Sequence, residues 1–128
     1  MHEEDMAILK SLAVIAWTDG RVTAEEHEHL EALISAFGAT ETEAKQVRDY
    51  AAVPRTMEDI PLTDLSAGDR RTLLNHAVVL SFVDGHQADK EKEMINALVG
   101  KLHIPVEEAT RIIDAAEARV KRLLEISQ

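Results

Sequence analysis

The stretch that decides the fold runs from Ala13 to Glu26 and reads AVIAWTDGRVTAEE. It occurs again from Val78 to Glu91 as VVLSFVDGHQADKE, and a shift of 65 positions aligns the copies without a gap over residues 9–49 and 74–114. The residues that match across this shift are Asp19 and Asp84, Gly20 and Gly85, Glu26 and Glu91, Glu28 and Glu93, Leu33 and Leu98, Glu43 and Glu108, and Ala44 and Ala109, while Trp17 meets Phe82. An internal repeat fixes the architecture before any single residue is interpreted. The sequence therefore predicts two similar helical halves.

Helical periodicity runs through the whole chain. Apolar residues recur at three- and four-residue spacing, and no alternating segment is bounded by turn residues on both sides, so the fold is predicted to be all-α. The predicted helices cover residues 3–18, 24–37, 41–52, 67–83, 89–100 and 106–126. The connection, residues 53–66, contains two prolines and a short helical turn. We expect a single domain, residues 1–128, with repeat one over about 3–52 and repeat two over about 67–126.

Glycines and capping residues mark the predicted helix ends. Gly20 and Gly85 follow apolar helices, where glycine takes the left-handed conformation without a Cβ clash, so both are expected to have positive φ. Thr23 and Glu26 fit a capping box, in which each side chain satisfies a free backbone amide at a helix start. The two most apolar helices, 3–18 and 67–83, should cross at the centre of a pseudo-twofold helical bundle, with Trp17 and Phe82 in related surroundings.

Composition limits the classes of protein to which the chain could belong. It has 128 residues, 45% of them apolar, which is enough for one globular core. It has no cysteine, which excludes disulfides, thiolate metal sites and thiol catalysis. No apolar run approaches the roughly 20 residues of a bilayer span, and the first residues are acidic where a secretory signal would be basic. We therefore expect a cytoplasmic protein without a transmembrane segment.

The net charge of −10 is concentrated in the first half. Residues 1–64 hold 5 Lys and Arg against 14 Asp and Glu, whereas residues 65–128 hold 9 against 10. Nucleic-acid affinity depends on Lys and Arg displacing counterions from phosphates, so no nucleic-acid partner is expected. An acidic surface keeps a protein in solution, and it also attracts cations and basic partners.

The repeated motif resembles the TerB family of tellurite-resistance proteins, and it is similar to the amino-terminal module of certain membrane-anchored DnaJ-like co-chaperones. The shared pattern is an apolar helix that ends in Asp-Gly with a Glu seven positions after the Asp, present twice. The resemblance implies an all-α fold, a role in stress response rather than catalysis, and acidic positions that bind a divalent metal. The matching positions are Asp19, Glu26, Asp84 and Glu91. Between the Asp-Gly and the Glu the two copies differ, because the second has Gln87 where the first has Val22 and so fits the family pattern less well. No J-domain is present.

The residues themselves leave two interpretations of these carboxylates open. An EF-hand is excluded, because Ile15 and Trp17 would occupy ligand places that require oxygen donors. Glu26 and Glu91 lie near helix starts, where the helix dipole favours a negative charge without any function. Asp19 and Asp84 follow helix ends, where the same dipole opposes a carboxylate, so each needs a compensating partner. That partner is either the amides of the following turn or a hard cation such as Ca²⁺, Mg²⁺ or Mn²⁺.

No motif of catalysis is present: the chain lacks a nucleophile elbow, a phosphate-binding glycine loop and a His-Glu-x-x-His sequence. The leading hypothesis is a non-enzymatic stress-response module with a divalent cation at its Asp-Gly turns. The alternative is a protein-interaction scaffold that uses the acidic first half and the amphipathic helix 106–126 to recruit a protein partner, including one at a membrane surface. A hydrolase with paired carboxylates is a third hypothesis.

Overall fold

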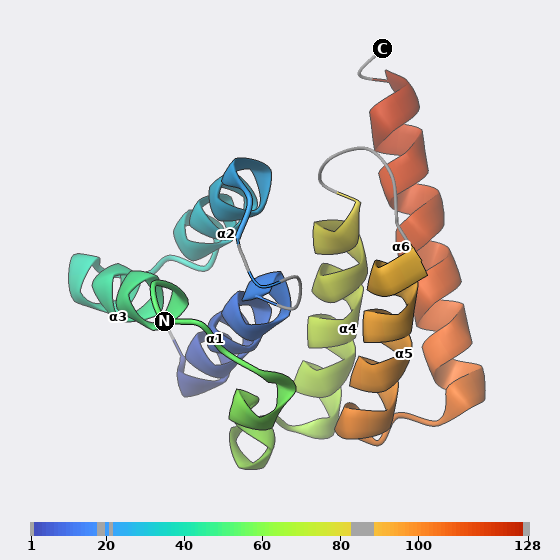
Figure 1. The fold of residues 1–128 in the computed structure, drawn as a ribbon, viewed down its shortest axis with the longest axis horizontal. Helices are drawn as coiled ribbons and strands as arrows, with labels where there is room; N and C mark the ends of the chain where they lie inside the picture. Colours follow the sequence, from blue (N-terminus) through green and yellow to red (C-terminus); the bar gives the residue numbers. More distant parts are fainter. Residues whose placement is uncertain (1, 18–19, 21, 83–88, 127–128) are drawn as a thin grey trace.

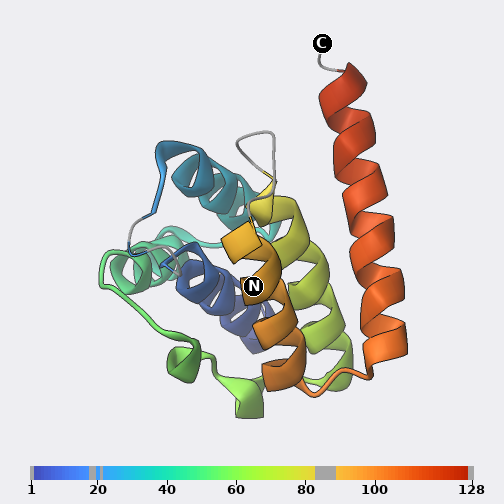
Figure 2. The ribbon, with the colours of Figure 1, turned by 45° about the vertical axis from the view of Figure 1, so that its right-hand side comes forward.

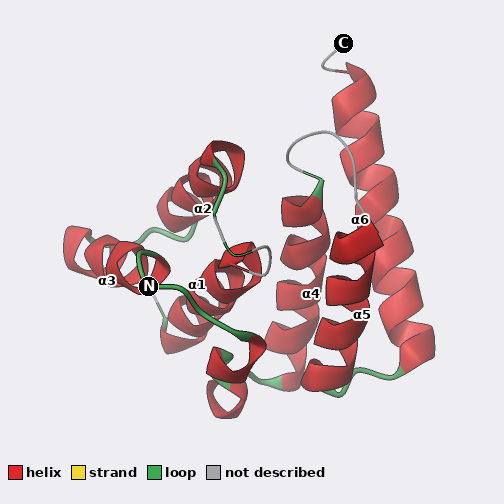
Figure 3. Ribbon diagram, in the orientation of Figure 1, coloured by secondary structure: helices red, strands yellow, loops and turns green. Residues whose placement is uncertain are grey.

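The computed structural model describes residues 2–17, 20, 22–82 and 89–126, with backbone alone for 89–91 and 124–126. Within that part the chain is helical and contains no strand, so the all-α prediction is confirmed (Figures 1 and 3). The six α-helices are α1 Glu3–Ala16, α2 Ala24–Ala36, α3 Glu41–Ala51, α4 Ala67–Ser81, α5 Asp89–Leu102 and α6 Val106–Ile126. Two short 3₁₀ helices, η2 Met57–Asp59 and η3 Leu62–Asp64, lie in the connection.

Three of the helices begin with a complete capping box. At α2 the Glu26 N–H donates to Thr23 Oγ1 over 3.1 Å, while Glu26 Oε1 accepts the Thr23 N–H over 3.0 Å. The start of α3 repeats this arrangement with Thr40 and Glu43, as predicted from its sequence. The start of α4 does so with Ser66 and Asp69. Local capping chemistry thus sets these three boundaries.

Helix ends follow the prediction less closely. Gly20 has φ +83°, which confirms the left-handed turn after α1, whereas Gly85 lies outside the described residues. The helix expected to end at about Gly100 instead continues to Leu102. His103 takes the left-handed conformation there, with φ +57°. Histidine adopts this conformation more readily than most residues, so a glycine was not needed to end α5.

The two apolar helices α1 and α4 form the centre of the molecule (Figure 1). α2 and α3 pack on α1, while α5 and α6 pack on α4, so each half is built around its own apolar helix. The fully buried leucines of this core include Leu9 and Leu12 of α1 and Leu73 and Leu74 of α4. The predicted central contact between these helices is therefore confirmed, while the pseudo-twofold axis remains a prediction.

Trp17 and Phe82 both pack into the molecule, but they make different contacts. Phe82 is buried with 6% of its surface exposed. Trp17 is only partly buried, and its indole Nε1–H donates to the Ala51 carbonyl over 2.7 Å. The phenylalanine ring has no equivalent donor, so the repeat preserves an aromatic residue here and not its hydrogen bond.

Arg70 binds the connection, residues 53–66, to the second half through hydrogen bonds. From the first turn of α4 it donates hydrogen bonds to three carbonyls, those of Leu62, Leu65 and Leu102, over 2.9, 3.2 and 3.1 Å. The planar guanidinium suits this arrangement because its donors point in fixed directions. The connection is thereby held against the end of α5.

We expect Gly20→Val to lower the free energy of unfolding by about 1–3 kcal/mol, because a β-branched side chain at positive φ strains the backbone. A Cβ built at Gly20 meets no atom within 4 Å, so the loss would come from backbone strain and not from a clash. Gly100→Ala is the matched control: it lies within α5, equally open, and should stabilise the protein by about 0.5–1 kcal/mol. Urea unfolding of both variants would measure the difference. Equal effects of the two substitutions would contradict the left-handed turn.

Candidate functional site

The first Asp-Gly corner joins the end of α1 to the start of α2. Its described residues include Gly20 in the left-handed conformation and Glu26 in the first turn of α2. The Glu26 carboxylate is held by its bond from the Thr23 amide, so the structural role predicted for this residue is confirmed. Asp19 lies outside the described residues. The position of its carboxylate relative to Glu26 is therefore still a prediction.

The second corner is less defined. Asp84 lies outside the described residues, and Glu91 is described only as backbone in the first turn of α5. Among the side chains that the structure describes, no group of three or more His, Asp and Glu is placed to hold a metal ion. That the four predicted carboxylates lie close together thus stays a prediction, and Glu26 is the one whose side chain the structure describes.

Two contacts hold the first corner in position. The hydrogen bond from Trp17 to Ala51 ties the residue after α1 to the last residue of α3. Val22, on the other side of Gly20, packs against the hydrophobic core. Described residues on both sides of Gly20, Trp17 before it and Val22 after it, thus make tertiary contacts.

Each half of the protein contains an ion pair between an arginine and a glutamate. In the first half Arg48 donates two hydrogen bonds to Glu31, over 2.7 and 2.8 Å, and these bonds lower the pKa of the Glu31 carboxyl. In the second half Arg71 of α4 pairs with Glu108 of α6 and lowers the pKa of that carboxyl. Both pairs are accessible to water, so their contribution to stability is small.

Glu43 and Glu108 occupy the same repeat position but have different partners. Glu43 caps its own helix, and its hydrogen bond from the Thr40 amide lowers the pKa of the carboxyl. Glu108 instead reaches across to another helix, where it accepts from Arg71 Nη2 over 2.9 Å. Identical residues at paired positions therefore do not prove identical roles, and the same caution applies to the pairs Asp19 with Asp84 and Glu26 with Glu91.

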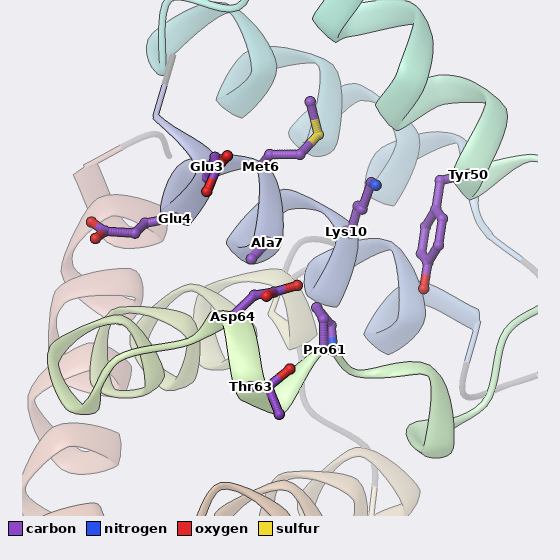
Figure 4. Close-up of a pocket in the computed structure, with 9 residues that line it drawn as sticks. All are labelled: Glu3, Glu4, Met6, Ala7, Lys10, Tyr50, Pro61, Thr63 and Asp64. Carbon is purple, nitrogen blue, oxygen red and sulfur yellow. The ribbon is translucent and has the colours of Figure 1, made fainter.

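A large hollow lies at the other end of α1 from the Asp-Gly corner (Figure 4). Its volume is about 680 Å³, and its lining residues are Glu3, Glu4, Met6, Ala7, Lys10, Tyr50, Pro61, Thr63 and Asp64. The Tyr50 ring already has partners, since Arg55 lies 3.7 Å and Lys10 Nζ 5.5 Å from its centroid. The Tyr50 hydroxyl donates to the Asp59 carbonyl over 3.1 Å, and burial raises the pKa of this phenol. Glu26, the predicted metal ligand whose side chain is described, is not among these lining residues.

Two half-buried histidines had no signal in the sequence as neighbours. His29 of α2 and His76 of α4 come from different halves, and only the fold brings them near each other. The sequence placed His29 beside His27 on one helix, where the two point to different faces. Nothing in the spacing of His29 and His76 could have identified them as neighbours.

The fold and the first corner can now be compared with known proteins. None of the described helices combines the length and apolar character needed to cross a bilayer. No curated protein and no solved structure gives a significant match to the chain. The model of the family described as "Tellurite resistance protein TerB" matches residues 5–114, a span that contains both Asp-Gly motifs and most of the helical frame. The chain therefore belongs to the TerB family of tellurite-resistance proteins.

Proposed function

We propose that this protein is a non-enzymatic, cytoplasmic stress-response module of the tellurite-resistance type that binds a divalent cation. The ligands would be Asp19 and Glu26 at the first corner and Asp84 and Glu91 at the second. Family membership supports the general role. The observation that supports the cation is at the first corner, where Gly20 is left-handed and the Glu26 carboxylate is held at the start of α2 by the Thr23 amide.

The helix dipole supports a ligand role for the two aspartates. α1 ends at Ala16 and α4 at Ser81, so Asp19 and Asp84 each follow a helix C-terminus. A carboxylate there is disfavoured by about 0.3–1 kcal/mol, and a bound cation would offset that cost. The same unfavourable placement occurs in both copies of the repeat. One ion shared by the corners, or one ion at each, would account for it.

The capping role of Glu26 is compatible with coordination. A carboxylate has two oxygens with about four acceptor directions, so its bond from the Thr23 amide does not by itself exclude a cation ligand role. Four carboxylates form a hard donor set that favours Ca²⁺, Mg²⁺ or Mn²⁺. Water and backbone carbonyls would complete the six to eight ligands that such cations take. When bound, the cation would neutralise part of the acidic charge near the corners.

Glu26→Gln and Glu43→Gln provide a matched test of this site. Both glutamates complete a capping box with a threonine, but only Glu26 belongs to an Asp-Gly motif. We expect the melting temperature of chelator-treated wild-type protein to rise by several degrees in saturating cation, since a ligand at 100 times its Kd stabilises by about 2.7 kcal/mol. This rise should persist in Glu43→Gln and shrink in Glu26→Gln, Asp19→Asn and Asp84→Asn. The fluorescence of Trp17, the single tryptophan, gives a second readout beside the first corner.

Two results would contradict the cation site. The first is the absence of any melting shift with Ca²⁺, Mg²⁺ and Mn²⁺ in the wild-type protein. The second is an equal shift in Glu26→Gln and Glu43→Gln together with unchanged shifts in the two aspartate variants. Either result would leave the aspartates as turn caps.

A specific observation favours a second candidate function, a protein-interaction scaffold. The last turns of α6 extend beyond α4 and α5 (Figure 2), and they lie after the end of the family match at residue 114. On these turns the apolar stripe continues from buried Val120 to Leu123, which is 57% exposed. Arg119, Lys121 and Arg122 flank it. Such an end would suit a protein partner, including one held at a membrane surface.

Leu123→Glu and Val106→Glu distinguish the two functions. Both side chains are exposed apolar residues of α6, Val106 being 74% exposed at its start. For a scaffold, an affinity pull-down should keep its partner when a chelator removes cations and when Val106 is changed, and it should lose that partner with Leu123→Glu. Folding should change by less than about 0.5 kcal/mol in either variant, because both positions are on the surface. A partner that is lost with the chelator would favour the cation-dependent function instead.

A further inference from the structure

The half-buried ring of His76 on α4 lies against the end of α2, the helix that also carries half-buried His29. The His76 ring on α4 packs edge to face against Phe37 at the end of α2, with centroids 5.9 Å apart and an interplanar angle of 87°. His29 lies two turns earlier on α2, and it is close enough to act electrostatically on His76. The two imidazoles therefore occupy the seam between the halves.

His29 has an unusual environment for a polar group. Its Nε2 is buried and, among the side chains that the structure describes, is the one buried polar side-chain atom without a hydrogen-bond partner. Leaving such an atom unpaired is unfavourable, because it loses its hydrogen bonds to water and gains none in the protein. A proton could be added to the imidazole only by placing a positive charge in the same buried seam, which is also unfavourable. The surroundings of His29 therefore disfavour its protonated form.

No carboxylate is among the groups that shift the pKa of either ring. On α2, Glu26 lies three residues before His29 and accepts the Thr23 amide. The group that acts on His76 from α6 is Arg119, which is also a cation. α1 contributes buried apolar side chains and Ser11, while its charged Lys10 lies over Tyr50. On α2 itself Glu31 is engaged by Arg48, and of the described charges of α5 Lys92 and Glu93 are exposed while Lys101 pairs with Glu58. Protonation would thus gather like charges from α2, α4 and α6.

Burial and the neighbouring groups both lower pKa values in this pair of histidines. Burial lowers the pKa of His29, and burial, His29 and Arg119 together lower the pKa of His76 from the ordinary value of 6.5. The unfolded or opened chain then takes up protons first as the pH falls. The stability contributed by the neutral histidines is complete above pH 6.5 and is lost as the pH falls through the two lowered pKa values.

We propose that His29 and His76 form an acid-sensitive latch that holds α2 on α4 when both are neutral and releases α2 when they are protonated. Release would separate α2 from the second half while α4 and α6 stay packed together. It would also expose the part of Phe37 that packs against the His76 ring. The protein would then open new apolar surface in mildly acidic surroundings.

The test is amide hydrogen exchange at about pH 7.5 and about pH 5, corrected for the intrinsic dependence of exchange on pH. In the wild-type protein the amides of α2 should lose protection at the lower pH while those of α4 and α6 keep it. The double variant His29→Gln, His76→Gln should lose most of this pH dependence. His27→Gln is the matched control, since His27 is an exposed histidine on the same helix, and this variant should behave as the wild type.

Side-chain NMR titration of the wild-type protein keeps the proposal testable if the double variant fails to fold. Both imidazoles should titrate with midpoints below about 6.5. The latch would be overturned by a midpoint at or above that value for either ring, by uniform loss of protection in all helices, or by an unchanged pH dependence in a folded double variant.

Discussion

The structure depends on the burial of α1 against α4. α1 is buried around most of its circumference, and α4 buries a wide apolar face, so both need the cover that the other provides. Leu9, Leu12, Leu73 and Leu74 have almost no exposed surface, and burying a side chain of this size contributes about 1.5–3 kcal/mol. The other α-helices mainly cover what this central pair leaves uncovered. Loss of the central contact would therefore remove the frame on which the other described helices pack.

The sequence predicted most of this frame, because its main signals are local. Helical spacing and capping boxes act within a few residues, and they placed the starts of α2, α3 and α4 correctly. The difference at the end of α5 is also local: the helix was predicted over residues 89–100, but α5 continues to Leu102 and His103 supplies the left-handed residue. Glycine permits that conformation without enforcing it, so a helix can continue through one when packing favours it.

The candidate site was predictable only in part. The Thr23 and Glu26 box followed from spacing, and the structure confirms it. The three-carbonyl role of Arg70 and the proximity of His29 to His76 did not follow, because the groups concerned are distant in sequence. Repeat symmetry is no substitute for such contacts, as Glu43 and Glu108 show by binding different partners at one repeat position. Whether Asp19 and Asp84 have the same role therefore does not follow from their matching positions in the repeat.

α2 is the helix on which these features converge. Its first turn carries Glu26, its middle carries His29 and Glu31, and its end meets His76 through Phe37. Its packing rests mainly on α1, so fewer contacts fix its position than fix α4, which lies between α1, α5 and α6. Elements with few buried contacts open at lower free energy than the global unfolding of a protein. A charge added near α2, whether a cation at its first turn or a proton at its buried face, therefore acts on a part of the fold that a few kcal/mol can move.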